Sequence, residues 1–524
     1  MTIRESRFDL IDEPWIPCLM ADGATCELGL AEVFARARGV REIFDESPLV
    51  TVSLHRLLLA ILHRNFGPAD EKRWLELWRS GWNPEVLDAY FSRWRQRFNL
   101  FDSERPFFQV PEMDDTGRQP VSALFQQFAT GNNATLFDHS FEEQPRCLSF
   151  AADARGVIAR QVFSVGFGKS SPFYFSDSPL IRGYTVLVWG GNLFETLLLN
   201  LIRYDAENPI PRHGEGPDLP AWEQDDRSIP RKDGNVPFGY LDYLTWQSRR
   251  IHLFCESDGS GVRWCQLQQN LKLSAAAAAV DPFKCYRKDE KRGWIALSFR
   301  EERALWRDSH ALLQGLGEAH SRPRILDWLE NVSAPTTEVS IPRVPALAAF
   351  GLATDPGRAA SVTLWRHERM ALPVACFSNE ALVEKLGQAI AYAEQTGRDL
   401  RSAGWSLARA LLEPPSEGAG AHQTRAREDE VGPLARSFGV ERRYWPALDA
   451  PFLEFMDQLA KGAPNSRGDY FGQWRKLVRD KAREAFTAVA RDFDLTARQL
   501  RAVAIAERSL FDRLRQGLQE GEPP

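Results

Sequence analysis

The sequence predicts an α+β protein in which a large mixed α/β N-terminal domain, residues 1–375, precedes a C-terminal four-helix bundle, residues 376–524. Short apolar runs broken by Pro, Gly and Asn fill residues 100–300, whereas long helical periods dominate after residue 376. A hydrophobic content of 44%, with 16 Trp and 32 Phe, supplies enough apolar surface for large cores. At about 150 residues per domain, 524 residues suffice for two to four domains.

The N-terminal domain is predicted to open with a β-hairpin. Residues 8–30 read as strand, turn and strand around the pair Asp22-Gly23, which is typical of a tight turn. Helices are expected at 30–38 and 49–66. The second is apolar on nearly all sides, so we expect it to be buried.

Three tryptophans, Trp74, Trp78 and Trp82, recur at intervals of four and would share one helix face. A core stripe is favoured over a ligand platform. Further along, the sequence predicts in order a strand, a helix, a long loop and a β-rich region: 183–191, 192–204, 205–236 and 250–300.

The C-terminal domain is predicted to begin with a helix over 378–412, capped by Ser378. A connection at 413–433, rich in Pro, Gly and charge, is predicted to be mobile. Three further helices would complete the bundle: 449–461, 468–492 and 496–518.

The charge balance limits the class of function. A formal net charge of −6 argues against a uniformly basic protein that coats DNA, although 65 Lys and Arg can still form a local basic groove. The first 17 residues carry acids where a signal peptide has its apolar core, and the apolar run 57–62 is too short to span a bilayer. We therefore expect a soluble cytoplasmic protein without a membrane partner.

The sequence offers little support for catalysis. GFGKSS (166–171) ends like a P-loop, but Phe163 stands where the first glycine is required. Asp138-His139 has no second pair to support a metal nuclease, and G-x-S-x-G and H-E-x-x-H are absent. The seven cysteines are scattered without C-x-x-C spacing, which indicates reduced thiols and no metal. We predict no enzyme and no cofactor.

Basic residues are more suggestive of nucleic acid. Arg475, Arg479 and Arg483 recur at every fourth position and would line one helix face. A solvated amphipathic face is the favoured interpretation, and a face that contacts the DNA backbone is the alternative. Lys272 is the one cation between Arg263 and Lys284, on an expected strand.

Five stretches occur in a characteristic order: FDLIDEPWIP (8–17), ERPFFQ (104–109), NNATLFDHS (132–140), VGFGKS (165–170) and ASVTLWRHER (360–369). Together they resemble the large subunit, CasA, of the type I-E CRISPR Cascade complex. The resemblance implies a non-catalytic subunit of an RNA-guided antiviral complex that recognises the protospacer-adjacent motif (PAM) in double-stranded DNA. It further implies that the subunit helps to open the duplex and recruits a helicase-nuclease.

The resemblance also suggests residues that contact DNA. Gly166, Phe167, Gly168 and Lys169 match the family's glycine loop, whose backbone can approach base edges in the minor groove. Lys169 replaces a further glycine of the family pattern, so it would either add a phosphate contact or narrow the motif tolerated. Lys272 is the candidate for the lysine that the family places in the groove.

The wedge that parts the first base pair is expected at Gly357, Arg358 and Ala359, counted back from WRHER. The family's glutamine is missing there. Arg358 would instead stack on an exposed base or hold a phosphate.

A docking loop is expected at 131–141, where glycine and asparagines supply a bend and an apolar pair forms the tip. It would order on assembly with other Cascade subunits, near the 5′ end of the CRISPR RNA. Its candidate docking residues are Asn133, Leu136, Phe137, Asp138 and His139.

Two other functions remain open at this point. The chain could be a mainly structural scaffold whose partners make the DNA contacts. A nuclease or NTPase would require metal-dependent cleavage or ATP turnover by the purified chain, which the missing motifs argue against.

The docking loop can be tested by placing aspartate at both Leu136 and Phe137. The charged tip should weaken incorporation into the complex, measured by co-purification, while circular dichroism shows that the isolated chain stays folded. Unchanged incorporation would mean that the stretch is only a loop with a buried tip.

Overall fold

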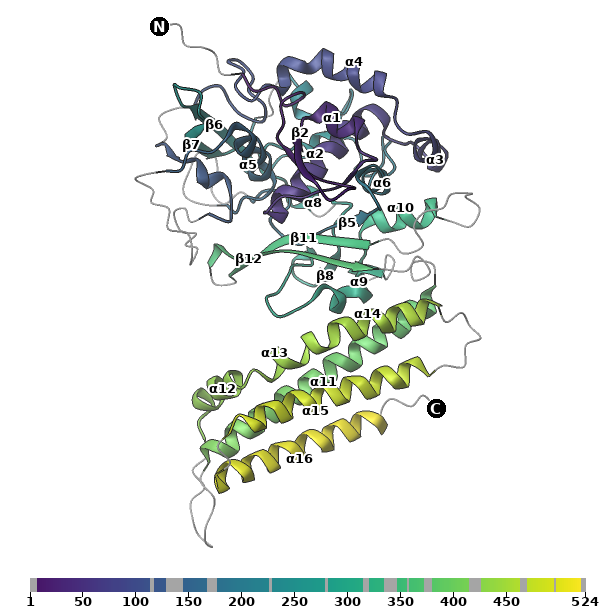
Figure 1. Ribbon diagram of the computed structural model, residues 1–524, viewed down its shortest axis with the longest axis vertical. Coiled ribbons are helices and arrows are strands. Elements are labelled where there is room, and N and C mark those ends of the chain that lie inside the picture. Colours follow the sequence, from purple (N-terminus) through teal and green to yellow (C-terminus); the bar gives the residue numbers. More distant parts are fainter. Residues whose placement is uncertain are drawn as a thin grey trace. The chain divides into compact units, whose positions relative to one another are not determined.

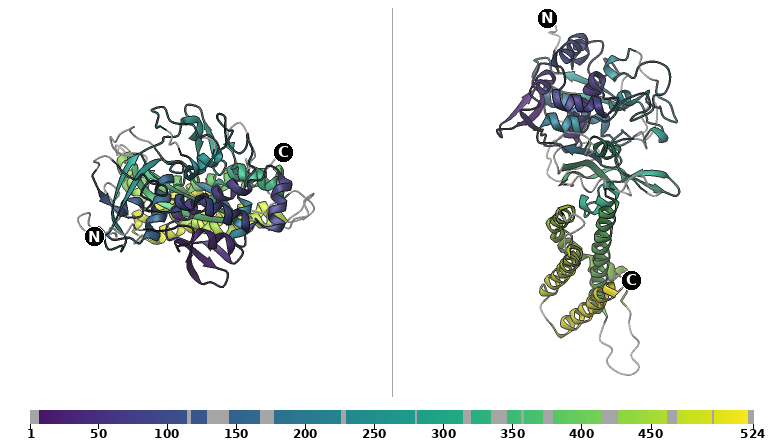
Figure 2. Two further views of the ribbon diagram at one scale, coloured as in Figure 1. Left: turned by 90° about the horizontal axis from the view of Figure 1, so that it is seen from above. Right: turned by 90° about the vertical axis from the view of Figure 1, so that its right-hand side faces the viewer.

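The computed structural model of the chain is shown in Figures 1 and 2. It separates into two compact units: unit 1 comprises residues 1–301 and 314–374, and unit 2 comprises residues 302–313 and 375–524. The residues that the structure describes are 7–113, 117–128, 145–166, 177–225, 229–278, 281–313, 320–333, 346–355, 358–371, 379–413, 426–461, 469–493 and 496–519.

Unit 1 opens with the predicted hairpin. Strands β1 (Ile16–Met20) and β2 (Thr25–Leu28) pair antiparallel, and β3 (Val40–Ile43) joins the other edge of β1. Gly23 lies in the turn with φ +88°, a conformation that favours glycine. Helix α1 (Leu30–Ala35) follows, shorter than predicted.

Helix α2 (Pro48–Phe66) forms the centre of unit 1. Every residue from 49 to 63 is buried, which confirms the prediction that this helix, apolar on nearly all sides, lies in the core. Helix α5 (Phe150–Val162), helix α7 (Tyr240–Leu244) and strand β11 (Ala346–Asp355) pack against it.

The tryptophan stripe is partly as predicted. Trp74 and Trp78 stack on helix α3 (Glu71–Ser80) with ring centroids 5.1 Å apart, and Trp74 is buried. Gly81, at φ +79°, ends the helix, so Trp82 lies beyond it rather than on the same helix face. Trp82 is nevertheless buried among aromatic rings, as a core residue should be.

The main sheet of unit 1 is antiparallel with the order β12-β11-β5. Strand β5 (Thr185–Trp189) confirms the predicted strand, and β11 forms a long hairpin with β12 (Arg358–Ala371). A second sheet has the order β4-β7-β6 and contains β6 (Arg249–Cys255) and β7 (Val262–Gln269). The remaining elements of unit 1 are α4 (Pro84–Trp94), η1 (Arg95–Phe98), β4 (Gln119–Pro120), η2 (Val121–Leu124), α6 (Leu193–Leu199), η3 (Ala221–Glu223), α8 (Ala275–Ala278), β8 (Tyr286–Asp289), β9 (Gly293–Ala296), β10 (His320–Ser321) and α10 (Arg324–Val332).

Unit 2 is helical, as predicted. Its long helices lie side by side (Figure 1) and are α11 (Glu380–Leu412), α14 (Pro446–Lys461), α15 (Tyr470–Arg491) and α16 (Ala497–Gln519). The N-cap of α11 is Asn379, whose side chain accepts a hydrogen bond from the amide of Leu382. Ser378, the predicted cap, lies outside the described residues.

Two short helices, α12 (Glu428–Ser437) and α13 (Val440–Tyr444), accompany the four long ones in the described part of unit 2. Residues 428–433, predicted as part of a mobile connection, form the first part of α12 in the structure. Val431 and Ala435 pack on Ala408 of α11. Three acidic residues in the first turn of α12 stabilise the helix by interacting with its dipole. The segment 414–425 lies outside the described residues.

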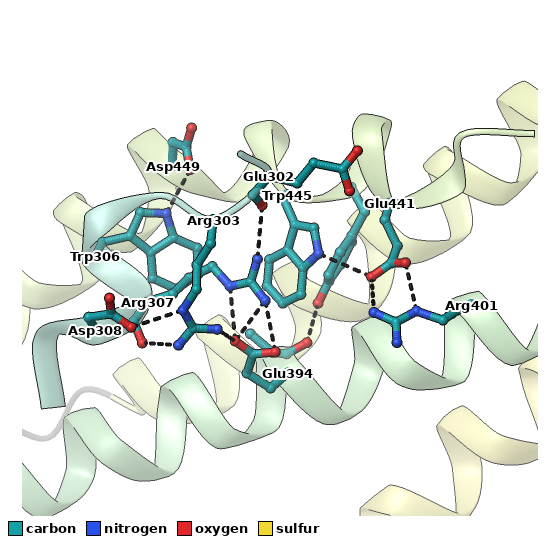
Figure 3. Close-up of polar contacts among 12 residues, drawn as sticks. Glu302, Arg303, Trp306, Arg307, Asp308, Glu394, Arg401, Glu441, Trp445 and Asp449 are labelled. Atoms are coloured by element: carbon teal, nitrogen blue, oxygen red, sulfur yellow. Dashed lines mark hydrogen bonds and ion pairs between the residues drawn. The ribbon is translucent and has the colours of Figure 1, made fainter. Parts of the chain in front are cut away.

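Residues 302–313 precede the sheet hairpin in sequence but group with the helices of unit 2. They form η4 (Leu305–Asp308) and α9 (Ser309–Leu313). Figure 3 shows the reason: Glu394 of α11 accepts from Arg303 at 2.6 Å and from Arg307 at 2.9 Å. The Arg307 guanidinium also lies 3.5 Å from the ring centroid of Trp445.

The Glu394 cluster makes the stability of unit 2 pH-dependent. Burial alone would raise the pKa of Glu394, but the charges and hydrogen bonds of Arg307 and Arg303 lower it below its ordinary value. A carboxylate with a lowered pKa stabilises the folded state above its unfolded pKa. That contribution is lost as the pH falls through the folded pKa.

Glu394→Gln should therefore destabilise unit 2 at neutral pH by about 1–3 kcal/mol, because Arg307 loses its carboxylate partner and Arg303 loses Glu394 while it retains Asp308. Thermal unfolding should show that the difference in stability between wild type and Glu394→Gln shrinks as the pH falls below the pKa of an ordinary glutamate. Glu384→Gln, at an exposed position of the same helix, is the matched control. Equal unfolding of wild type and Glu394→Gln at pH 7 would contradict the assignment.

Candidate nucleic-acid interface

The predicted glycine loop begins at a closed stem. The amide of Gly166 donates to Oδ1 of Asp177 at 2.9 Å, and the amide of Ser178 donates to the carbonyl of Ser164 at 2.9 Å. Phe167, Gly168 and Lys169 lie outside the described residues. The two ends of the segment 167–176 are thus fastened to each other.

A buried arginine holds one side of this stem. Arg249, the first residue of β6, is 1% exposed and donates through Nη2 to the carbonyls of Ser164 at 3.1 Å and Val165 at 3.2 Å. Its Nη1 donates to the carbonyl of Ser248 at 2.8 Å. Burial, followed by the nearby charge of Arg160, lowers the pKa of Arg249 to about 9.

Polar side chains behind the stem tie it to α5 and β6. Gln161 donates to the carbonyl of Phe108 at 3.0 Å and accepts from the amide of Arg249 at 2.9 Å. The hydroxyl of Ser248 donates to the carbonyl of Gln161 at 2.6 Å and lies 2.6 Å from the hydroxyl of Ser178. The stem therefore rests on a hydrogen-bonded polar layer rather than on an apolar surface.

A second buried cation supports the other side. The ammonium of Lys284 is buried and donates to the carbonyls of Pro179 at 2.7 Å and Arg182 at 2.8 Å. Burial lowers its pKa to about 8. The backbone that leaves the loop is thus held by a lysine, as the backbone that enters it is held by an arginine.

The stem is linked to the tip of the β11–β12 hairpin. Arg182 forms an ion pair with Oδ2 of Asp177 at 2.8 Å and donates to the hydroxyl of Thr354 at 2.9 Å. Thr354 lies near the end of β11, and Asp355 pairs in register with Arg358 at the start of β12. The structure therefore brings the stem at Gly166 close to the hairpin end that carries the predicted wedge.

The predicted wedge itself is only partly described. The backbones of Arg358 and Ala359 belong to β12, whereas Gly357 lies outside the described residues. The whole candidate docking set lies outside them as well: Asn133, Leu136, Phe137, Asp138 and His139.

Lys272 does not lie on a strand, contrary to the expectation. Strand β7 ends at Gln269, and the chain then turns so that the amide of Asn270 donates to the carbonyl of Ser248 at 2.9 Å. The carbonyl of Lys272 accepts from the amide of Asn235 at 2.7 Å. Its half-buried side chain forms no hydrogen bond or ion pair within the described residues.

The arginines of α15 contact neighbouring rings in unit 2. The Arg475 guanidinium lies 4.7 Å from the ring centroid of Phe471, and that of Arg483 lies 5.0 Å from the ring centroid of Phe511. Arg483 is also 3.7 Å from Asp480, and Arg479 is half-buried. These contacts favour the interpretation of an amphipathic helix face over a face that contacts the DNA backbone.

The part of the chain that the structure describes contains no group of three His, Cys, Asp or Glu side chains placed to hold a metal ion. No helix within the described ranges is long and apolar enough to cross a membrane.

Sequence reasoning missed the residues that hold the stem: Asp177, Arg182, Arg249 and Lys284. Arg249 and Lys284 bond to main-chain carbonyls, whereas Asp177 and Arg182 pair with each other, and such partners leave no motif in a sequence. The one available signal for Arg249 is a cation at the start of an otherwise apolar strand pattern.

Comparison with known proteins identifies the family. The family model described as CRISPR-associated protein Cse1 matches residues 9–485. The chain belongs to the Cse1 family. A CRISPR-associated protein CasA/Cse1 of Thermus thermophilus is 33% identical over 519 residues, covering 97% of each chain. The resemblance drawn from five short stretches is thereby confirmed.

The Cse1 fold is confirmed by solved structures. The crystal structure of Cse1 from Acidimicrobium ferrooxidans matches with a TM-score of 0.80 and 26% identity over 99% of both chains. A chain of a structure titled CRISPR RNA-guided surveillance complex matches with a TM-score of 0.76 and 22% identity. It covers 96% of this Cse1 chain and 99% of that one, and it shows the same fold.

Proposed function

We propose that this chain is the non-catalytic large subunit of a type I-E Cascade complex and reads the PAM in double-stranded DNA. Its membership of the Cse1 family supports the place in a CRISPR system, and its fold is shared with a chain of an RNA-guided surveillance complex. In this function the guide RNA reads the target by base pairing, and the protein reads the short flanking motif.

The observation that carries the proposal is the closed stem beneath the predicted glycine loop. A loop that reads the minor groove has to present backbone groups to base edges without a large ordering cost. Two hydrogen bonds fasten the ends of the loop, one between Gly166 and Asp177 and one between Ser178 and Ser164. Arg249 also holds the carbonyls of Ser164 and Val165. The minor groove mainly distinguishes A·T from G·C pairs, which favours tolerant reading of the motif.

Duplex opening would occur next to this reading site. Arg182 connects Asp177 of the stem to Thr354 of the hairpin. The predicted wedge, Gly357, Arg358 and Ala359, comes only three to five residues after Thr354 in the sequence. A motif bound at the loop would place the adjoining base pair at the hairpin tip. Arg358 would then stack on an unpaired base or hold its phosphate.

The proposed partners are those of a surveillance complex in the cytoplasm: other Cascade subunits, the 5′ region of the CRISPR RNA, the target duplex and a helicase-nuclease. The segment with Leu136 and Phe137 would dock the chain into the complex. Lys272, whose ammonium has no bond within the described residues, would enter the DNA groove.

A structural scaffold is the second candidate, and two observations favour it. The net charge is −6, and two of the three arginines on α15 lie over aromatic rings rather than standing free. In that case partner subunits would make the DNA contacts.

Gly168→Asp should weaken PAM-dependent binding by the assembled complex at least about tenfold, because a carboxylate adds bulk and charge repulsion in the groove. Affinities are measured at one fixed salt concentration by electrophoretic shift on duplexes with and without the motif. Gly117→Asp is the matched control, since Gly117 is exposed and a Cβ there would meet no atom within 4 Å. Equal affinities for Gly168→Asp and wild type would reject the loop as the reading element.

Arg358→Ala should impair duplex opening more than initial binding, because the wedge acts after the motif is bound. Permanganate footprinting of unpaired thymines measures opening, and the shift assay measures binding. Arg292→Ala, at an exposed turn, provides the control for loss of one positive charge. Normal opening by Arg358→Ala would exclude this role.

A further inference from the structure

Unit 1 contains a cleft of about 410 Å³, and none of the predicted site residues that the structure describes lines it. Its floor is the start of β6 and the end of β7, where Arg250 and Gln268 stand opposite each other in antiparallel register. Gln247, just before β6, lies on the same floor, and Phe107 and Phe108 of the ERPFFQ stretch form one wall. We call this the amide cleft.

The floor of the amide cleft presents free polar groups. Arg250, Gln247 and Gln268 are half-buried. Within the described residues, neither the guanidinium of Arg250 nor the side-chain amides of Gln247 and Gln268 form a hydrogen bond or an ion pair. A half-buried guanidinium and two amides without protein partners are costly unless water or a ligand binds them.

The other charges around the cleft already have partners. Arg97 and Arg105 both pair with Asp225, at 2.7 and 3.1 Å. The carboxylate of Asp242 accepts from the amide of Phe238 at 2.8 Å and from Gln224 at 3.1 Å. Arg250 is therefore the cation among the described lining residues that forms no ion pair, and it favours an anionic ligand.

The wall of the cleft holds a strained backbone. Phe108, at φ +53°, is the one non-glycine residue with positive φ in the described part of the chain. Non-glycine residues rarely adopt this conformation, and it persists where the surroundings hold it, often at ligand sites. The carbonyl of Phe108 accepts a hydrogen bond from Gln161 at 3.0 Å.

We propose that the amide cleft binds one unstacked nucleotide of a single-stranded nucleic acid. Arg250 would bind the phosphate, and Gln247 and Gln268 would bind the base edge, since an amide offers both a donor and an acceptor. The phenylalanine wall would cover the apolar part of the base. A volume of about 410 Å³ lies within the range of small-ligand pockets. The described residues of the loop stem and of the hairpin do not line this cleft.

The proposal is tested on the full chain with fluorescent single-stranded DNA and RNA hexanucleotides of mixed sequence. Polarisation at fixed salt should show saturable binding that weakens at least about fivefold in both Arg250→Gln and Gln268→Leu. Arg287→Gln removes an exposed arginine of β8 outside the cleft and should bind like wild type. Thermal unfolding checks that each variant is folded.

No saturable binding, or equal weakening in Arg250→Gln and Arg287→Gln, would overturn the proposal. If one variant fails to fold, the other decides, because each removes a different contact to the nucleotide. The source of the nucleotide is identified in the assembled complex by photocrosslinking from 4-thiouridine in the guide RNA or 4-thiothymidine in either DNA strand. A crosslink to the cleft from one strand supports the site and names the source, and crosslinks from none would contradict it.

Discussion

The guanidinium of Arg249 is 1% exposed, and its described hydrogen bonds go to the main-chain carbonyls of Ser248, Ser164 and Val165. Removing a charge from water costs several kcal/mol, so Arg249 can stay buried only while those carbonyls remain in place. The backbone entering the glycine-loop segment is fixed by that requirement. Lys284 imposes the same requirement on the backbone that leaves it.

Because these two buried cations hold the backbone on either side of the segment 167–176, the ends of that segment are fixed by residues outside it. The stem is held by side chains outside the loop, so the loop itself can contain glycines and still begin and end at fixed points. Asp177 and Arg182 extend the same arrangement to the hairpin through Thr354. A reading element and a strand-parting element on one framework would act on adjacent base pairs without an intervening change of fold.

Much of the fold could be predicted because its signals are local. Apolar residues on nearly all sides of α2 predicted that it is buried, and the Asp22-Gly23 pair predicted the first hairpin. The helix α12 could not be predicted, since its charges and Pro433 resemble a linker while its stability comes from packing on Ala408 of the preceding helix α11. The order of five short stretches predicted the family. The supports of the site remained hidden, because a guanidinium bonded to carbonyls depends on the tertiary fold and leaves no motif.

The central claim is that this chain, rather than its partners, distinguishes the motif beside the target. The most direct measurement compares complexes assembled with and without this chain on duplexes that carry a randomised flank, at one salt concentration, by electrophoretic shift and sequencing of the bound DNA. We predict that the complex containing the chain enriches a short flanking motif and that the complex lacking it enriches none. The same enrichment without the chain would contradict the account and leave it the role of a scaffold.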